Sequence, residues 1–216
     1  MSPTEAFRID TEDGLSLEAV VDEAEEVRAG LVFCHPHPKM GGTMNAPLIL
    51  AVRDHLVSDR WGVLRFNFRG IGDSEGTAGM GLEEIKDAAA AVAHAKSLWP
   101  GRPIAIAGWS FGAAVAIKVA AADPELKACI AVAPAVKEKP GITAGLPPPD
   151  EVALIMPTLF IVGANDDLTL PEDARTWAAE AGVTFSEMRG ANHFFWAKYE
   201  KLVAEITGFL DDALSL

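Results

Sequence analysis

The stretch Pro103-Ile104-Ala105-Ile106-Ala107-Gly108-Trp109-Ser110-Phe111-Gly112 decides how we interpret this chain. An apolar run leads into a serine between two glycines, and the small residues 113–117 follow. A serine in a tight strand-to-helix turn needs almost no side chain two residues before and after it, because other backbone passes close by. Gly108 and Gly112 meet this need. The stretch therefore predicts a nucleophile elbow at Ser110, with a structural turn and an idle serine as the alternative.

Two further polar residues follow apolar runs at positions where strands are expected to end. Asp166 comes after the run 159–162, and His193 comes after the run 183–185. The chain order serine, acid, histidine is one of the known orders of a catalytic triad. Asp167 competes for the acid role, but we interpret it as solvated or as the start of the next turn. An ordinary loop histidine is the alternative for His193.

The three residue types fit one kind of chemistry. A serine hydroxyl is a weak nucleophile at neutral pH, so it needs a base within hydrogen-bond reach and a third group that orients the base. We expect His193 to take the proton of Ser110 and Asp166 to hold the imidazole. The constellation predicts attack of Ser110 on a carbonyl carbon.

A tetrahedral intermediate also needs N–H donors aimed at its oxyanion. The backbone amide of Phe111, directly after the nucleophile, is one candidate. The second is expected in the loop 34–43, where Pro36 and Pro38 have no N–H to offer. This leaves the backbone amide of His37 as the predicted second donor.

Length, charge and cysteine content exclude several classes of protein. The 216 residues suit one domain, 1–216, with a buried core. A net charge of -13 argues against binding to nucleic acid or to an anionic membrane. Residues 1–20 hold no uninterrupted apolar stretch of the kind found in a signal peptide or membrane anchor. Cys34 and Cys129 lie in expected strands that the strand before Ser110 separates, so we predict two buried free thiols and a cytoplasmic protein.

Apolar strands alternate with helical patterns along the chain. We expect an antiparallel hairpin first, from strands 7–9 and 15–20 around the turn 12–14. The later expected strands are 30–34, 62–68, 103–107, 128–132, 158–162 and 183–188. The expected helices are 47–58, 82–98, the one after the elbow, 171–181 and 194–214. This alternation predicts an α/β protein with a mostly parallel sheet that is covered on both faces.

The segment Lys137 to Asp150 interrupts this alternation. It contains four prolines and two glycines, shows no periodicity and follows a strand end. Ligands bind at that edge of open α/β sheets. A surface connection and a short flap over the site are both open interpretations.

Three other chemistries compete for nearby residues. His35 and His37 are spaced to share a metal ion, but no third ligand is apparent nearby. Cys34 is a nucleophile in principle, yet it ends a buried strand. The glycine-rich loop 67–74 lacks the lysine of a phosphate-binding loop, so we interpret it as scaffold with Arg69 paired to an acid. We therefore expect no metal and no cofactor.

Several motifs together resemble the α/β-hydrolase superfamily. They are His35-Pro36-His37-Pro38, Gly41-Gly42-Thr43-Met44-Asn45, Arg65-Phe66-Asn67-Phe68-Arg69-Gly70, the elbow, and Gly190-Ala191-Asn192-His193-Phe194-Phe195. More narrowly, they look like the small lidless serine hydrolases close to dienelactone hydrolases and bacterial carboxylesterases, over about residues 5–215. The resemblance implies a sheet of roughly seven to eight strands, an antiparallel second strand and esterase-type acyl transfer. Dienelactone hydrolase itself uses a cysteine nucleophile, whereas this elbow carries a serine.

We therefore expect a serine hydrolase that acts on a small or medium carboxylic ester, with thioesters and activated amides as related substrates. Met40, Met44, Trp109 and Phe194 flank the site and are candidates for an apolar substrate pocket. Two alternatives stay open, namely a small peptidase or amidase of the same fold and a non-catalytic binding protein. A sheet edge and the last helix are compatible with a homodimer.

Overall fold

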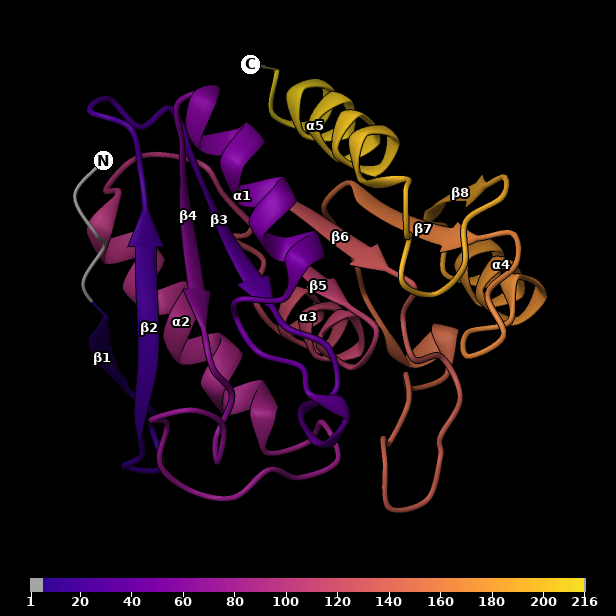
Figure 1. The fold of residues 1–216 in the computed structure, drawn as a ribbon, viewed down its shortest axis with the longest axis horizontal. Helices are drawn as coiled ribbons and strands as arrows, with labels where there is room; N and C mark the ends of the chain where they lie inside the picture. The colour runs from indigo at the N-terminus through magenta and orange to yellow at the C-terminus, as the bar shows by residue number, and fades with distance from the viewer. Residues whose placement is uncertain (1–5, 216) are drawn as a thin grey trace.

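The computed structural model describes residues 6–215 and contains one eight-stranded sheet in the order β1-β2-β4-β3-β5-β6-β7-β8 (Figure 1). The strands are β1 Phe7–Asp10, β2 Ser16–Asp22, β3 Ala29–Cys34, β4 Trp61–Phe66, β5 Ile104–Trp109, β6 Ala128–Val132, β7 Thr158–Gly163 and β8 Thr184–Met188. The α-helices are α1 Pro47–Ser58, α2 Glu84–Leu98, α3 Phe111–Ala122, α4 Pro171–Glu180 and α5 Tyr199–Leu214, and short 3-10 helices span Pro38–Met40 and Pro149–Glu151. β1 and β2 pair antiparallel, β2 pairs antiparallel with β4, and the remaining pairs are parallel. The predicted fold class and antiparallel second strand are therefore confirmed.

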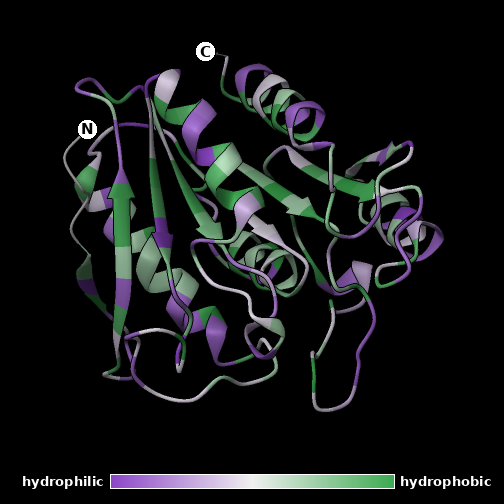
Figure 2. Ribbon diagram, in the orientation of Figure 1, coloured by the Kyte–Doolittle hydropathy of each residue, from purple (hydrophilic) through white to green (hydrophobic). Residues whose placement is uncertain are grey.

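Helices cover both faces of the sheet. Side chains of α1 and α5 pack in one core cluster, and side chains of α2, α3 and α4 pack in the other. Neighbouring residues of one strand point to opposite clusters, as Leu31 and Val32 do. Both faces of the central strands are apolar for this reason, whereas α5 alternates between hydrophobic and hydrophilic residues (Figure 2). The two cysteines are buried and free, and β5 lies between their strands, as predicted.

Two expected element boundaries were wrong. The strand expected to reach Phe68 ends at Phe66, because the backbone N–H of Phe68 donates to the ring of His35 instead of to a neighbouring strand. The last helix begins at Tyr199 and not at residue 194. Phe195 and Ala197 have φ of 52° and 57°, and this left-handed conformation interrupts a helix.

The carboxyl ends of the parallel strands meet at one edge of the sheet. The loop after β3 leads to α1 on one face, and the loop after β5 leads to α3 on the other. Because β3 and β5 are neighbours, the two loops diverge and leave a crevice at the usual ligand-binding position of open α/β sheets. Within residues 6–215, every helix is too short or too polar to cross a membrane.

Candidate active site

Ser110 lies in the tight turn between β5 and α3. Its φ of 56° and ψ of -113° are strained for a residue with a side chain. A Cβ added at Gly108 would lie 2.2 Å from the carbonyl O of Gly112, and one added at Gly112 would lie 2.3 Å from the carbonyl O of Cys34. The Ser110 N–H donates to the carbonyl O of Val132 at 2.8 Å, which ties the turn to β6. The two glycines are therefore required by close backbone contacts, and the turn projects the serine out of the sheet edge.

A continuous chain of hydrogen bonds joins the three residues singled out in the sequence. His193 Nε2 lies 2.9 Å from Ser110 Oγ, and His193 Nδ1 lies 2.9 Å from Asp166 Oδ2. An ionised carboxylate only accepts hydrogen bonds, so Nδ1–H donates to Asp166 and Nε2 accepts from the Ser110 hydroxyl. The carboxylate of Asp166 is fully buried, and the ring of His193 is nearly so. This arrangement keeps His193 in the tautomer that is able to accept a proton from Ser110.

The loop after β7 brings Asp166, and not Asp167, to the imidazole. Asp166 Oδ1 accepts from the backbone N–H groups of Leu168 and Thr169 at 2.9 and 2.7 Å, which fixes the carboxylate. Asp167 is exposed and lines the neighbouring pocket. Among residues 6–215, no ion-pair partner is found for it. The two adjacent acids therefore occupy different environments, one held against a ring and one facing solvent.

His37 and Phe111, the two residues whose backbone amides were predicted as oxyanion donors, line the same pocket as Ser110. Within the described part of the chain, neither N–H has an intramolecular acceptor. Phe111 begins α3, and the first amides of a helix have no partner within it. The ring of Phe111 packs edge-on against His37 at 5.1 Å between ring centres. Among the described residues, the pocket lining thus includes two residues whose backbone N–H groups have no acceptor within the protein.

The other two histidines at this edge have both ring nitrogens occupied. His35 Nδ1–H donates to the carbonyl O of Pro36 at 2.7 Å, and its Nε2 accepts from Phe68 N–H at 3.0 Å. His37 Nε2–H donates to the carbonyl O of Ile142 at 2.9 Å, and its Nδ1 accepts from Lys39 N–H at 3.1 Å. Burial lowers the pKa of His35 to about 4, so this ring is neutral at pH 7. Among residues 6–215, His35 and His37 belong to no group of three or more side chains suited to a metal ion.

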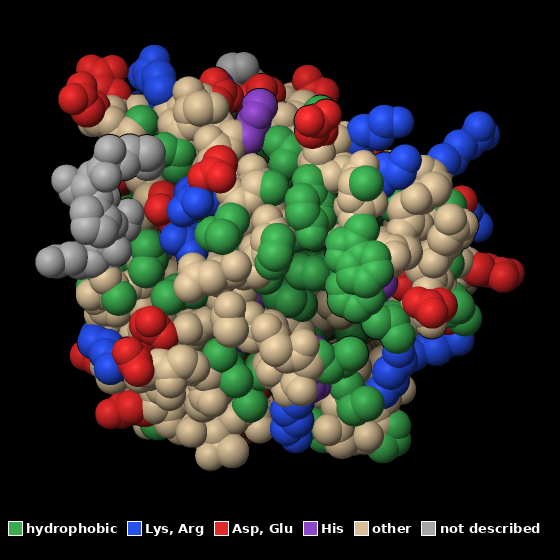
Figure 3. Space-filling model, in the orientation of Figure 1, with side chains coloured by type: hydrophobic (Ala, Val, Ile, Leu, Met, Phe, Trp, Pro, Cys, Tyr) green, Lys and Arg blue, Asp and Glu red, His purple; other side chains and the backbone are tan. Residues whose placement is uncertain are grey.

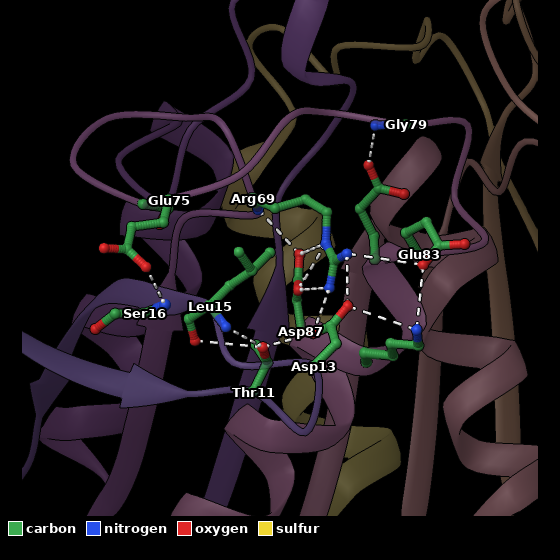
Figure 4. Close-up of polar contacts among 12 residues, drawn as sticks. Thr11, Asp13, Leu15, Ser16, Arg69, Glu75, Gly79, Glu83 and Asp87 are labelled. Carbon is green, nitrogen blue, oxygen red and sulfur yellow. Dashed lines mark hydrogen bonds and ion pairs between the residues drawn. The ribbon is translucent and has the colours of Figure 1, made fainter.

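The loop after β4 anchors this edge through Arg69. Its guanidinium donates to both carboxylate oxygens of the buried Asp87 and to Asp13 from the β1–β2 turn (Figure 4). These carboxylates raise the pKa of Arg69 against the opposing effect of burial, and hydrogen bonds from Thr11 and Arg69 lower that of Asp13. The prediction that Arg69 pairs with an acid is confirmed, and the loop serves as scaffold.

Arg65 in β4 and Asn67 just after it hold the loop that carries His37. Asn67 Oδ1 accepts from Met44 N–H at 2.9 Å, and Arg65 donates to the carbonyl O of Met44 at 3.1 Å. Arg65 is itself paired with the buried Asp22 at 2.7 Å. Met44 is consequently held inside the protein, and its side chain is buried away from the pocket. Its assignment as a pocket residue was therefore wrong.

A pocket of about 530 Å³ opens beside Ser110 and His193. Met40, Trp109 and Phe194, three of the predicted pocket residues, line it. Most of the remaining lining is also apolar, with Pro36, Ala46, Pro47, Ala135, Val136, Ile142, Leu168 and Leu170 contributing. None of these eight residues was predicted as a pocket residue, and Ile142, Leu168 and Leu170 come from loops whose sequence has no periodicity. A volume of this order holds a small organic molecule.

The segment that follows β6 forms one wall of this pocket. Lys139 and Thr143 exchange two backbone hydrogen bonds and close a small hairpin. The carbonyl O of Ile142 at its tip accepts from His37, and both Ile142 and Val136, which precedes the hairpin, line the pocket. The segment therefore forms a short wall of the site and is hydrogen-bonded to the side chain of His37. It combines features of a surface connection and of a short flap, the two interpretations left open by the sequence.

Comparison with known proteins gives one family. Residues 25–154 match the model of a family described as serine aminopeptidase, S33. A curated protein of Rickettsia prowazekii, itself uncharacterised, is 30% identical over 186 residues, which is 82% of this chain and 76% of the relative.

Solved structures give the same result. An α/β serine hydrolase homologue from Coxiella burnetii is 28% identical, with a TM-score of 0.83 over 95% of this chain and 97% of that one. A serine hydrolase without a lid from Xanthomonas campestris is 26% identical, with a TM-score of 0.83 over 100% of this chain and 97% of that one. The matches extend over nearly the whole chain.

Proposed function

This chain belongs to the serine aminopeptidase S33 family of α/β hydrolases, and we propose that it cleaves small or medium carboxylic esters through an acyl-enzyme on Ser110. The observation that carries this proposal is the hydrogen-bond chain from Asp166 through His193 to Ser110 at the wall of an apolar pocket. A buried base that is oriented by a carboxylate and contacts a serine hydroxyl is the arrangement that activates serine as a nucleophile.

The reaction then runs in two halves. His193 Nε2 takes the hydroxyl proton while Ser110 Oγ bonds to the ester carbonyl carbon, and the amides of His37 and Phe111 donate to the oxyanion. The intermediate collapses, the bond to the alcohol oxygen breaks, and His193 gives its proton to the leaving alcohol. Water follows the same path, and its attack on the acyl-enzyme releases the acid. Asp166 stays ionised and stabilises the charged imidazole.

The pocket favours an uncharged substrate. Its lining is mostly apolar, and Lys137 pairs with Asp173 at 2.8 Å, so these two opposite charges offset each other. Esters and thioesters bring no charge to the cleaved bond, and their leaving groups depart more easily than an unactivated amine. We therefore place esters first, with thioesters and activated amides handled by the same groups.

Asp167 supports one second candidate. An aminopeptidase holds the free ammonium group of its substrate, and the exposed Asp167 carboxylate lines the pocket without an ion pair to any of the described residues. The two substrate classes separate in one assay, because p-nitrophenyl butyrate has no ammonium group and alanine p-nitroanilide does. Faster turnover of the anilide, lost on Asp167→Asn, would favour the peptidase.

Covalent labelling tests the proposal directly. We expect a fluorophosphonate to label the protein at Ser110, and the label to vanish in Ser110→Ala. We also expect p-nitrophenyl esters between acetate and octanoate to be hydrolysed with a burst of p-nitrophenol equal to the enzyme concentration. Absence of both labelling and turnover would instead favour a non-catalytic binding protein on this fold.

A further inference from the structure

An exposed pair of stacked aromatic rings lies next to the catalytic histidine of the proposed site. Trp196 is 65% exposed, and its ring stacks on Phe194 with centres 4.9 Å apart and planes 14° apart. Phe194 lines the pocket and contacts the ring of His193 edge-on at 5.5 Å. It also contacts Trp109 edge-on at 6.1 Å. Two stacked rings therefore lead from the imidazole to solvent, with Phe194 on the side of His193 and Trp196 on the outside.

The backbone holds Trp196 outward by a conformation that costs free energy. The residues on both sides of it, Phe195 and Ala197, have positive φ, although neither is a glycine. The side chain of Phe195 is fully buried and anchors the turn, and Lys198 N–H donates to its carbonyl O at 2.9 Å. Burial of the Phe195 side chain thus offsets the cost of a loop conformation that leaves the Trp196 ring exposed to water.

Other exposed apolar side chains surround the same opening. Met40, Ile142, Leu168 and Leu170 line the pocket and are all exposed, Met40 to 66%. On the face viewed in Figure 3, hydrophobic side chains gather in the middle and most charged side chains lie toward the periphery. A contiguous apolar area with charged surroundings marks a binding surface for an apolar group.

The mechanism indicates which part of the substrate meets the rings. His193 gives its proton to the departing alcohol, so that alcohol must lie on the His193 side of the reacting carbonyl. Phe194 and Trp196 follow His193 in the chain and contact its ring or each other. We infer that the alcohol part of the substrate carries an aromatic ring, which stacks on the exposed face of Trp196 in the Phe194–Trp196 pair. This inference rests on the proposed function and narrows its substrate class to esters of aromatic alcohols.

Two esters of one acid test the inference. Benzyl butyrate and cyclohexylmethyl butyrate have similar size and a similar primary alcohol, but only the first has a flat π face. We expect the wild-type kcat/KM to be roughly fivefold higher for benzyl butyrate, the size of one aromatic pair interaction. Trp196→Leu keeps an apolar side chain without a π face and should bring the ratio close to one. Trp196→Phe should restore part of it.

Ile155→Ala is the matched control, because Ile155 is 73% exposed and lines a separate hollow beside Pro157 and Leu214. It should leave the ratio unchanged. A wild-type ratio of one, or a ratio that survives Trp196→Leu, would overturn the inference. The inference would also be overturned if Trp196→Leu leaves the ratio of the two kcat/KM values unchanged but converts a dimer into a monomer. In that case the rings bind a second copy of the chain. Fluorophosphonate labelling separates the two proposals, because a labelled enzyme without this preference refutes only the aromatic alcohol.

Discussion

The loop after β3 and the loop after β8 each place a buried histidine at the same edge of the sheet, but the two rings have different partners. His35 bonds through both nitrogens to backbone groups, Pro36 O and Phe68 N–H. His193 bonds through one nitrogen to a carboxylate and through the other to a hydroxyl. Backbone amides and carbonyls neither take up nor release a proton at ordinary pH, whereas a serine hydroxyl is able to give one up during attack. Burial alone therefore does not define a catalytic histidine, and the partner at the second nitrogen does.

The largest expected difference between the two loops is in turnover. His193→Gln should lower kcat/KM for p-nitrophenyl butyrate by about 10⁵-fold, because removing the base of a triad leaves only binding and oxyanion stabilisation. His35→Gln should change it by less than about tenfold, since His35 touches no reacting atom. If both variants are equally well folded and lose similar factors in kcat/KM, His193 and His35 do not differ in their role in catalysis.

The two adjacent acids, of which only Asp166 bonds to the His193 ring, give the next largest expected difference. Asp166→Asn should lower kcat/KM by about 10⁴-fold, because an amide favours the wrong tautomer of His193. Asp167→Asn is the neighbouring control and should change ester turnover by less than about threefold, since this carboxylate is exposed to solvent. Steady-state kinetics on one ester measures both. A larger effect at Asp167 would exchange the roles of the two acids.

The lowered pKa of His35 should make the free energy of unfolding depend on pH. Burial lowers the pKa of this ring from 6.5 to about 4 in the folded state, so the unfolded chain binds the proton first as the pH falls. The contribution of neutral His35 is complete above pH 6.5 and is lost between pH 6.5 and 4, by about 2 to 3 kcal/mol. Urea unfolding at pH 7.5 and 4.5 checks this. The difference between wild type and His35→Gln should shrink by that amount, and a constant difference would contradict the assignment.

The smallest expected effect concerns the backbone of the two loops. The β3 loop places Gly41 at its positive φ of 81°, whereas the β8 loop places Ala197 at 57°. Gly41→Ala should therefore destabilise the protein by about 1 kcal/mol, and Ala197→Gly should stabilise it by about 1 kcal/mol or less. Thermal unfolding of the two variants measures both. Shifts of the same sign would show that strain is not what separates these loops.

Particular residues show how far the sequence alone predicts this molecule. The apolar runs and the glycines around Ser110 identify every strand and the elbow, because local periodicity and close contacts leave a direct signature. The start of α5 was missed because Phe194, Phe195 and Trp196 have the apolar character of a helix face, while Phe195 packs into the core and the other two rings stack on each other outside it. The pocket wall from Ile142 and Leu168 was missed because its position depends on long-range bonds such as His37 to Ile142. The presence of each strand is thus encoded locally, whereas the lining of a pocket is set by contacts between distant loops.

The elbow has a consequence for how this protein is able to diversify. Its two glycines leave no room for even one added carbon, since such an atom would lie 2.2 or 2.3 Å from a neighbouring carbonyl oxygen. Ser110, by contrast, points outward from the sheet edge and is partly exposed. A mutational library should therefore tolerate exchange of the attacking atom, such as oxygen for sulfur in Ser110→Cys, far better than any change at the frame. A change of reaction chemistry in this scaffold is therefore expected to arise by substitution at position 110, while Gly108 and Gly112 stay fixed.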